Sequence, residues 1–218
     1  MSNGFFIAFE GGEGSGKTTQ INKLAESLAN DGYKVTTTRE PGGTPDAETI
    51  RDLVVQRGGG DWTPMAEMLL IYAAREMHLQ QVIHPALEEG KIVLCDRFID
   101  STTAYQGYGH GLDLDIIQKI RTLVMGTFQP DLTLILDLEP EIGLQRSGRR
   151  LAAEELNIDQ TEDRFENMDI DFHNRLRAGF LEIAKQEATR CHVVDAAQDI
   201  EAIQEQLYSC AKERLEQR

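Results

Sequence analysis

An eight-residue segment near the amino terminus constrains the fold of this chain more than any other feature. The segment, Gly11-Gly12-Glu13-Gly14-Ser15-Gly16-Lys17-Thr18, matches the phosphate-binding loop pattern G-x-x-x-x-G-K-[ST]. An apolar run precedes it at Phe5–Phe9, and a helical stretch begins near Lys17. A loop of this kind between a strand and a helix predicts an α/β fold that binds a nucleoside triphosphate.

The residue types of the loop suit a polyphosphate. Its glycines let successive backbone N–H groups point at phosphate oxygens without obstruction by a Cβ atom. Lys17 would place a positive charge near the β- and γ-phosphates, and the Thr18 hydroxyl would bind Mg²⁺. The predicted ATP site consists of Gly11, Gly12, Glu13, Gly14, Ser15, Gly16, Lys17, Thr18 and Thr19.

Short apolar runs alternate with helical stretches along the whole chain. The runs are Phe5–Phe9, Lys34–Thr38, Ile92–Cys95, Leu132–Leu138 and His192–Val194. Runs that are apolar throughout suit strands covered on both faces, so the pattern predicts a parallel sheet with helices on both sides. Ligands collect at the carboxyl ends of such strands.

The helical stretches predict one domain over residues 1–218. Met65–Leu87 has the composition of a long, largely buried helix that ends before Gly90. The exception to the regular pattern is the polar segment Arg149–Thr161, which lacks an apolar stripe and is expected to interrupt two helices.

Composition excludes several classes of protein. A formal net charge of -15 argues against a sequence-independent nucleic-acid binder. The three cysteines lack metal-ligand spacing, and free thiols suggest a reducing cytoplasm. We find no long apolar span or signal peptide, so no membrane association is expected.

Charged residues follow two of the predicted strands. Arg39 precedes a rigid Pro41-Gly42-Gly43 turn and is expected to contact a ligand. Asp96 is placed to hold Mg²⁺, and Arg97 to pair with a phosphate. The alternative is a structural ion pair between Asp96 and Arg97.

Two further features are ambiguous from the sequence alone. The run 101–107, which contains Tyr105 and Gln106, offers hydroxyls, an amide and a ring for a sugar and a base, or is only a helix cap and a turn. Arg75 is one charge in an apolar stretch: it is a ligand contact or half of a buried ion pair with Glu67 or Glu76.

Three arginines, Arg146, Arg149 and Arg150, would share one face of a helix. Like charges at this spacing repel each other, and a bound anion would offset that repulsion. The cluster therefore predicts a phosphate-clamping lid over about residues 146–161 that supplies an arginine finger. Neither an Asn-Lys-x-Asp motif nor an Asp-x-x-Gly motif after the third strand is present, which argues against a GTPase switch.

With these residues together, the chain resembles a thymidylate kinase of the branch typical of bacteria. The resemblance covers nearly the whole chain. Beyond the P-loop, it rests on residues 38–44, Asp96-Arg97, Ala104-Tyr105-Gln106-Gly107, residues 130–133, Leu136-Asp137 and Asp163-Arg164-Phe165-Glu166-Asn167.

The resemblance implies a five-stranded parallel sheet in the order 2-3-1-4-5, a homodimer, and transfer of phosphate from Mg²⁺-ATP to dTMP. It assigns the phosphate of dTMP to Arg39, Arg75 and Arg97, the base and sugar to Gln106 and Tyr105, and the metal to Thr18 and Asp96. The implied dTMP site consists of Glu13, Arg39, Pro41, Ile71, Arg75, Arg97, Thr102, Tyr105 and Gln106. The implied catalytic group consists of Lys17, Asp96, Arg97, Arg146, Arg149 and Arg150.

The resemblance also gives meaning to Glu13 and to the lid. In the family, an acid at the Glu13 position accepts a hydrogen bond from the nucleotide's sugar. The P-loop here has no basic residue before Lys17, which is typical of the branch whose lid supplies the catalytic arginine, and Arg150 aligns best with that arginine. The chain departs from the family at Ile71, where many members carry a thymine-stacking Phe, and at Gly148, where some carry another arginine.

Two alternatives remain open from the sequence. One is a P-loop kinase for another nucleotide or a nucleoside, although a nucleoside kinase would not need Arg39, Arg75 and Arg97. The other is a nucleotide-binding switch ATPase, which would hydrolyse ATP slowly and without stimulation by dTMP.

Overall fold

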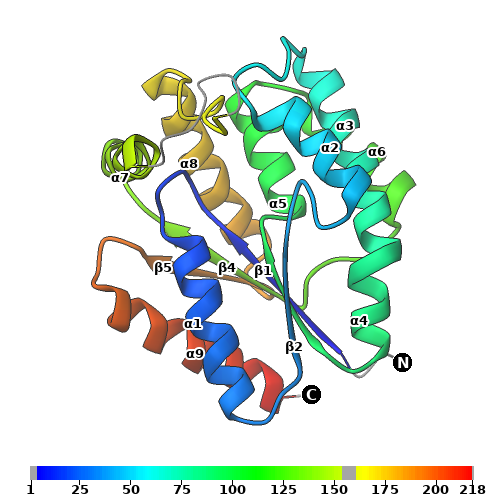
Figure 1. The fold of residues 1–218 in the computed structure, drawn as a ribbon, viewed down its shortest axis with the longest axis vertical. Coiled ribbons are helices and arrows are strands. Elements are labelled where there is room, and N and C mark those ends of the chain that lie inside the picture. Colours follow the sequence, from blue (N-terminus) through cyan, green and yellow to red (C-terminus); the bar gives the residue numbers. More distant parts are fainter. Residues whose placement is uncertain (1–3, 154–160, 218) are drawn as a thin grey trace.

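The protein is built around a parallel sheet of five strands. The computed structural model describes residues 4–153 and 161–217. Its strands are β1 (Phe5–Glu10), β2 (Val35–Arg39), β3 (Ile92–Asp96), β4 (Leu132–Asp137) and β5 (Cys191–Asp195). Their order in the sheet is β2-β3-β1-β4-β5, and every pairing is parallel, which confirms the predicted topology (Figure 1).

Helices cover both faces of this sheet. They are α1 (Lys17–Asn30), α2 (Pro45–Val55), α3 (Pro64–His78), α4 (His84–Glu88), α5 (Ile99–Thr102), α6 (Leu114–Met125), α7 (Pro140–Ala153), α8 (Ile170–Gln186) and α9 (Ile200–Glu216), with π-helical turns η1 (Leu79–Ile83) and η2 (Thr103–Gly109). Five of the described helices begin on a Thr or Asp whose side chain accepts a backbone N–H of the first turn: Thr44, Thr63, Asp113, Asp169 and Asp199. These residues cap N–H groups that have no partner within the helix.

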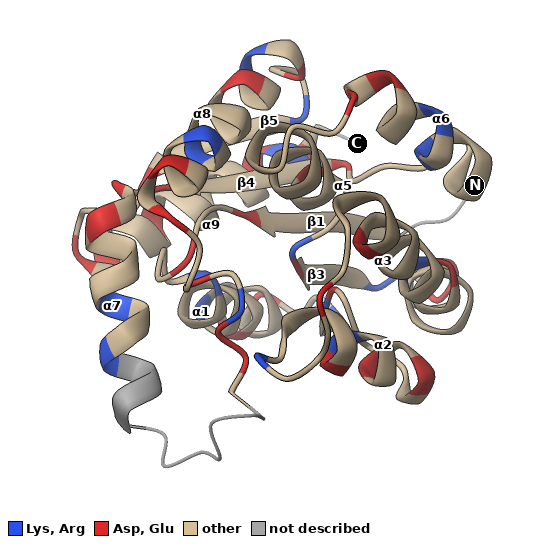
Figure 2. Ribbon diagram, turned by 90° about the horizontal axis from the view of Figure 1, so that it is seen from above, with Lys and Arg blue, Asp and Glu red and all other residues tan. Residues whose placement is uncertain are grey.

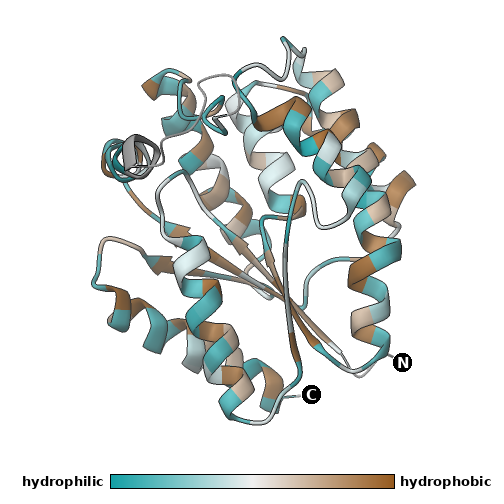
Figure 3. Ribbon diagram, viewed as in Figure 1, coloured by the Kyte–Doolittle hydropathy of each residue, from teal (hydrophilic) through white to brown (hydrophobic). Residues whose placement is uncertain are grey.

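Alternation along β1 divides the core between the two faces. Phe5, Ile7 and Phe9 pack with α1 and α9, whereas Phe6 and Ala8 pack with α3, α4 and α6. A third cluster joins β4 to α8 and η2. Figure 3 shows brown along much of the central strands, surrounded by helices that carry both teal and brown residues. Burial on both faces explains why the strand runs are apolar throughout.

The predicted helix Met65–Leu87 is interrupted. Its helical backbone continues from Pro64 to Glu88, but Leu79–Ile83 forms a π-helical turn. Pro85 comes two residues after this turn and lacks the N–H that would bond to the carbonyl of Gln81, and a wider turn at this point makes room for the proline ring. The run 101–107 likewise forms α5 and a second π-helical turn rather than a cap and a loop.

The prediction that residues 149–161 interrupt two helices is wrong for its first part, because α7 continues to Ala153. Arg149 to Ala153 are all good helix formers, so intrinsic propensity favours continuing the helix through them. Residues 154–160 lie outside the described part of the chain. Among the residues that the structure describes, no helix has the length and apolarity needed to cross a membrane.

Candidate active site

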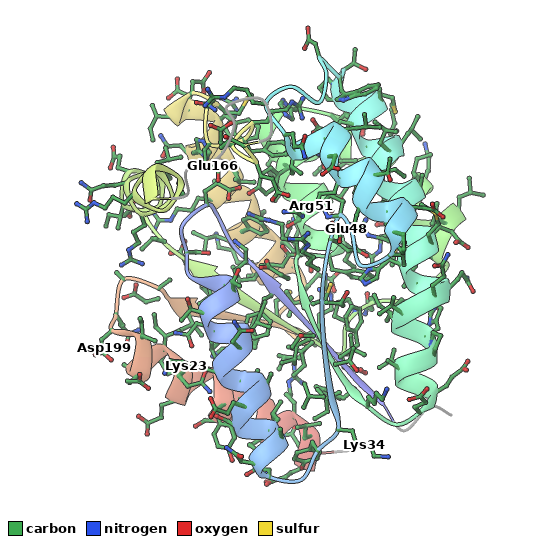
Figure 4. All side chains as sticks on the ribbon, viewed as in Figure 1. Lys23, Lys34, Glu48, Arg51, Glu166 and Asp199 are labelled. Carbon is green, nitrogen blue, oxygen red and sulfur yellow. The ribbon has the colours of Figure 1, made fainter. Side chains whose placement is uncertain are left out.

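One cleft opens at the carboxyl ends of β1, β2 and β3. Its volume is about 1250 Å³, which exceeds a usual pocket for one small molecule and leaves room for two nucleotides. Figure 2 looks down onto this edge of the sheet, with α1 between α7 on one side and α2 on the other. In Figure 4, Arg51 and Glu166 lie at this end of the molecule, far from Lys34 at the start of β2.

The P-loop forms the floor of the cleft. Gly11, Gly14 and Gly16 have positive φ angles of 135°, 64° and 90°, which only glycine adopts without strain. The Lys17 side chain is buried and curls back, with Nζ 3.2 Å from the carbonyl oxygen of Gly11 and 3.0 Å from that of Gly12. An ammonium held against the loop in this way is in place to meet phosphate oxygens that enter it.

The predicted metal residues lie together at the mouth of the cleft. The Thr18 hydroxyl donates to Asp96 Oδ2 at 3.2 Å. A hydroxyl and a carboxylate are hard oxygen ligands, and Mg²⁺ usually takes only one or two protein ligands beside phosphate and water. The pair therefore fits Mg²⁺. The described residues contain no cluster of three or more His, Cys, Asp or Glu that would bind a metal without a substrate.

Arg97 joins the P-loop to the opposite wall. Its guanidinium donates to Gly11 O at 2.9 Å and to Glu13 Oε1 at 3.0 Å, and its Cζ lies 4.9 Å from the centre of the Tyr105 ring. Burial alone would lower the pKa of Arg97, but Tyr105 and Glu13 raise it, so the group stays charged. Its salt bridge is therefore with Glu13 and not, as the structural alternative supposed, with Asp96.

Glu13 turns away from the phosphate cradle, as its charge requires. Its carboxylate accepts from Arg97 and from the Tyr105 hydroxyl. Burial would raise the pKa of Glu13, but Arg97 and Lys17 outweigh it and lower the pKa to about 2. The carboxylate is thus an ionised acceptor on the wall that Tyr105 shares.

The backbone of Arg97 has φ 66°, which is uncommon for a residue other than glycine. A buried carboxylate of β1, that of Glu10, holds the turn that follows. It accepts the backbone N–H groups of Phe98 at 2.9 Å and Ser101 at 3.0 Å, and the Ser101 hydroxyl at 2.5 Å. Glu10 therefore fixes the conformation from which Arg97 reaches the cleft.

Arg75 is buried in the cleft wall with one nitrogen unpaired. Its Nε donates to Glu40 Oε2 at 2.6 Å and its Nη2 to Phe98 O at 3.0 Å. Glu40 is thus the partner, and neither Glu67 nor Glu76, which the sequence suggested. Among the described residues Nη1 has no hydrogen-bond partner. A buried donor without a partner is costly, so a ligand atom is expected there.

The remaining predicted dTMP residues also line the cleft: Arg39, Pro41, Ile71, Thr102, Tyr105 and Gln106. Arg39 is half-exposed and pairs with Glu48 at 2.8 Å. Ile71 is buried, and the neighbouring Tyr72 points elsewhere, into the core beside Arg75. Besides Arg75 Nη1, the buried Thr102 Oγ1 and Gln106 Oε1 have no partner among the described residues.

The three lid arginines all belong to α7. Arg146 lines the cleft and donates to Ala196 O at 3.1 Å, and Arg149 is exposed. The side chain of Arg150 and residues 154–160 lie outside the described residues.

Several residues that line the cleft were not predicted from the sequence. Arg51 bonds bidentately to Glu162 at 2.9 and 2.6 Å, and Phe165 and Glu166 follow on the same wall. Arg51 lies among the polar residues of α2, and no sequence pattern there indicates a contact with a ligand. The motif Asp163–Asn167 carried the family resemblance, but its spacing alone indicated no contact.

Comparisons with known proteins agree with this geometry. A model of the thymidylate kinase family matches residues 9–207. Thymidylate kinase of Caulobacter vibrioides is 48% identical over 215 residues, which cover 99% of both chains. That of Geobacter sulfurreducens is 47% identical over 199 residues, 91% of this chain and 92% of the relative. The crystal structure of thymidylate kinase from Ehrlichia chaffeensis superimposes with a TM-score of 0.74 and 37% identity, over 95% of this chain and 98% of the other.

Proposed function

Because the chain belongs to the thymidylate kinase family and phosphorylates dTMP to dTDP with ATP as the donor, we propose that the residues of the cleft divide this reaction between a donor half and an acceptor half. The observation that carries the division is the cleft itself. The P-loop forms its floor, and three buried polar groups without partners among the described residues belong to its walls.

In the donor half, Gly11 to Thr19 bind the phosphates of ATP through backbone N–H groups, and Lys17 leaves the loop carbonyls for the β- and γ-phosphates. Thr18 and Asp96 hold Mg²⁺, which when bound neutralises charge on the phosphates. The hydrogen bond between these two side chains supports this assignment.

In the acceptor half, Arg97, Arg39 and Arg75 orient the phosphate of dTMP. Glu13, Tyr105, Gln106 and Thr102 contact its sugar and base, and Pro41 and Ile71 pack against it. The nucleophile is already a phosphate oxygen, so the reaction needs alignment and charge neutralisation more than a general base. The pairing of Arg97 with Glu13 and Tyr105 supports a preorganised acceptor wall.

Residues 146–161 act as a lid on a single catalytic unit, residues 1–218. Arg150 neutralises the migrating phosphoryl group, and Arg146 and Arg149 support it. The substitution Arg150→Ala should lower kcat by about 10³-fold or more with little change in dTMP affinity, because an arginine finger acts on the transition state. Arg146→Ala and Arg149→Ala should lower kcat less. An unchanged kcat in Arg150→Ala would refute the proposal that Arg150 acts as the arginine finger.

The enzyme works as a homodimer in the cytoplasm, without nucleic-acid or membrane partners. Exposed leucines on the neighbouring helices α2, α3 and α6 support a partner surface, Leu69 being 48% and Leu123 81% exposed. The three free cysteines support a location in the reducing cytoplasm, and the net charge of -15 supports the absence of a nucleic-acid partner. Sedimentation equilibrium tests the dimer.

A further inference from the structure

Gln106 has one end of its amide paired inside the protein and the other end unpaired. The residue is buried on η2 and lines the cleft. Its Nε2 donates to Glu67 Oε1 at 2.5 Å. Its Oε1 is buried and has no hydrogen-bond partner among the described residues. Gln106 Oε1 is therefore available to accept a hydrogen bond from a ligand.

Which end of an amide is which normally follows from its partners, because oxygen and nitrogen have nearly the same shape. Here the partner is a carboxylate, and an ionised carboxylate only accepts hydrogen bonds. Arg164 donates to the second oxygen of Glu67, so both carboxylate oxygens act as acceptors. Gln106 must then turn its NH₂ group to Glu67.

The surroundings hold Glu67 in this role. It is completely buried in the first turn of α3, where the helix dipole favours a negative charge. Arg164 is itself fixed, because its Nη1 also donates to Val54 O at 2.9 Å. His110 Nε2 is 3.9 Å from Glu67 Oε1, too far for a hydrogen bond.

We propose that Glu67 is a positioning residue that determines base specificity. By fixing the amide of Gln106, it presents Oε1 to the base as an acceptor. The ring N3–H of thymine can donate to that oxygen. The ring N3 of cytosine is itself an acceptor, so cytosine would face Oε1 without a proton between them. This inference rests on the proposed contact of Gln106 with the base.

The test compares dTMP with dCMP in the full-length enzyme. In Glu67→Gln the neutral amide can donate as well as accept, so Gln106 is free to turn over. The ratio of kcat/KM for dTMP to that for dCMP should fall about tenfold or more, because a turned amide no longer offers the thymine N3–H a hydrogen-bond acceptor. KM for dTMP should rise and kcat should change little. Where dCMP turnover is too slow to measure, its inhibition constant against dTMP replaces it.

A double-mutant cycle separates positioning from a general structural role. Gln106→Leu alone should lower the dTMP preference, and adding Glu67→Gln to it should lower the preference no further, because Glu67 acts through the amide. Asp163→Asn is the matched control. It breaks the ion pair with Arg57 on the segment that carries Arg164, and it should leave the preference unchanged.

Thermal unfolding checks that each variant is folded. If Glu67→Gln is not folded, the double substitution Glu67→Gln/Arg164→Met also removes the guanidinium that has lost its carboxylate partner, and it should show the same fall in the dTMP preference. An unchanged preference in the folded Glu67 variant, together with a fall in Gln106→Leu, would overturn the positioning role alone. An unchanged preference in both would overturn the contact of Gln106 with the base.

Discussion

Two carboxylates three residues apart, Glu10 and Glu13, have opposite electrostatic environments. Burial and the neighbouring Asp100 raise the pKa of Glu10 to about 7. Burial also acts on Glu13, but Arg97 and Lys17 lower its pKa to about 2. The difference follows from partners: Glu13 pairs directly with a guanidinium, whereas Glu10 accepts from neutral N–H and O–H groups.

For Glu13, the structure predicts a selective effect on the acceptor. Glu13→Ala removes the carboxylate that Arg97 and Tyr105 share, on the wall proposed for dTMP. KM for dTMP should rise about tenfold to a hundredfold, because buried partners lose their acceptor. KM for ATP should change much less. Steady-state kinetics with each substrate varied in turn decide this, and an equal loss for both substrates would indicate a damaged loop instead.

For Glu10, the prediction concerns stability. The folded protein keeps a proton on Glu10 between about pH 4.5 and 7, where the unfolded chain has released it. Stability should therefore fall as the pH rises through this window, by about 3 kcal/mol from this one group.

The substitution Glu10→Gln, which cannot ionise, should remove that fall. Urea unfolding of both proteins at about pH 5 and about pH 8 measures it. Identical pH dependence in the two proteins would show that Glu10 has no raised pKa.

The role of a residue was predictable where a sequence motif determines it. Its interaction partner was not predictable where only the fold brings the two residues together. The roles of Lys17, Thr18 and Asp96 were expected from spacing and strand ends, and the structure brings these residues to one cleft. The partner of Arg75 was missed, because Glu40 is 35 residues away and no local pattern links them. The same holds for Glu67 and Arg164.

At the scale of elements, the P-loop and helix α7 touch through two glycines. A Cβ atom added to Gly143 would lie 2.2 Å from the carbonyl oxygen of Glu13, and one added to Gly14 would lie 2.0 Å from that of Gly143. Such contacts with backbone cannot be relieved by a side-chain rotation. The helix that carries the lid arginines is therefore packed directly against the loop proposed to bind ATP.

This contact predicts opposite effects for two substitutions in one helix. Gly143→Ala should destabilise the protein and raise KM for ATP, because the P-loop must move away. Gly148→Ala, with open space around the added methyl, should stabilise it by about 0.5–1 kcal/mol, as Ala does in place of Gly within a helix. Denaturant unfolding and ATP titration measure both, and similar behaviour of the two variants would contradict the contact.

Element types were predictable from periodicity, and irregularities within them were not. All five strands were expected within a residue or two of their observed ends. The π-helical turns at Leu79–Ile83 and Thr103–Gly109 were missed, since an apolar stripe looks alike through an α- and a π-helical turn. The extent of α7 was missed because it carries no apolar stripe at Arg149 and beyond.

At the scale of the whole molecule, the sheet brings together residues that are far apart in the sequence. The P-loop follows β1, Arg39 ends β2, Asp96 ends β3, and Arg146 is on α7 after β4. Parallel strands with right-handed crossovers place all of these at one edge, which is why the fold and the position of the site could be expected from the sequence. The net charge of -15 makes the clustered arginines a local exception that attracts anionic substrates.

The central claim is that this cleft transfers phosphate from ATP to dTMP, and ATP consumption in the presence of different acceptors tests it most directly. The purified protein would be assayed with Mg²⁺-ATP alone and with dTMP, dUMP, dCMP, dAMP or dGMP. We predict slow consumption without an acceptor, the strongest stimulation by dTMP, and formation of one dTDP for each ADP. Stimulation by none of the monophosphates, or stronger stimulation by one other than dTMP, would contradict the claim.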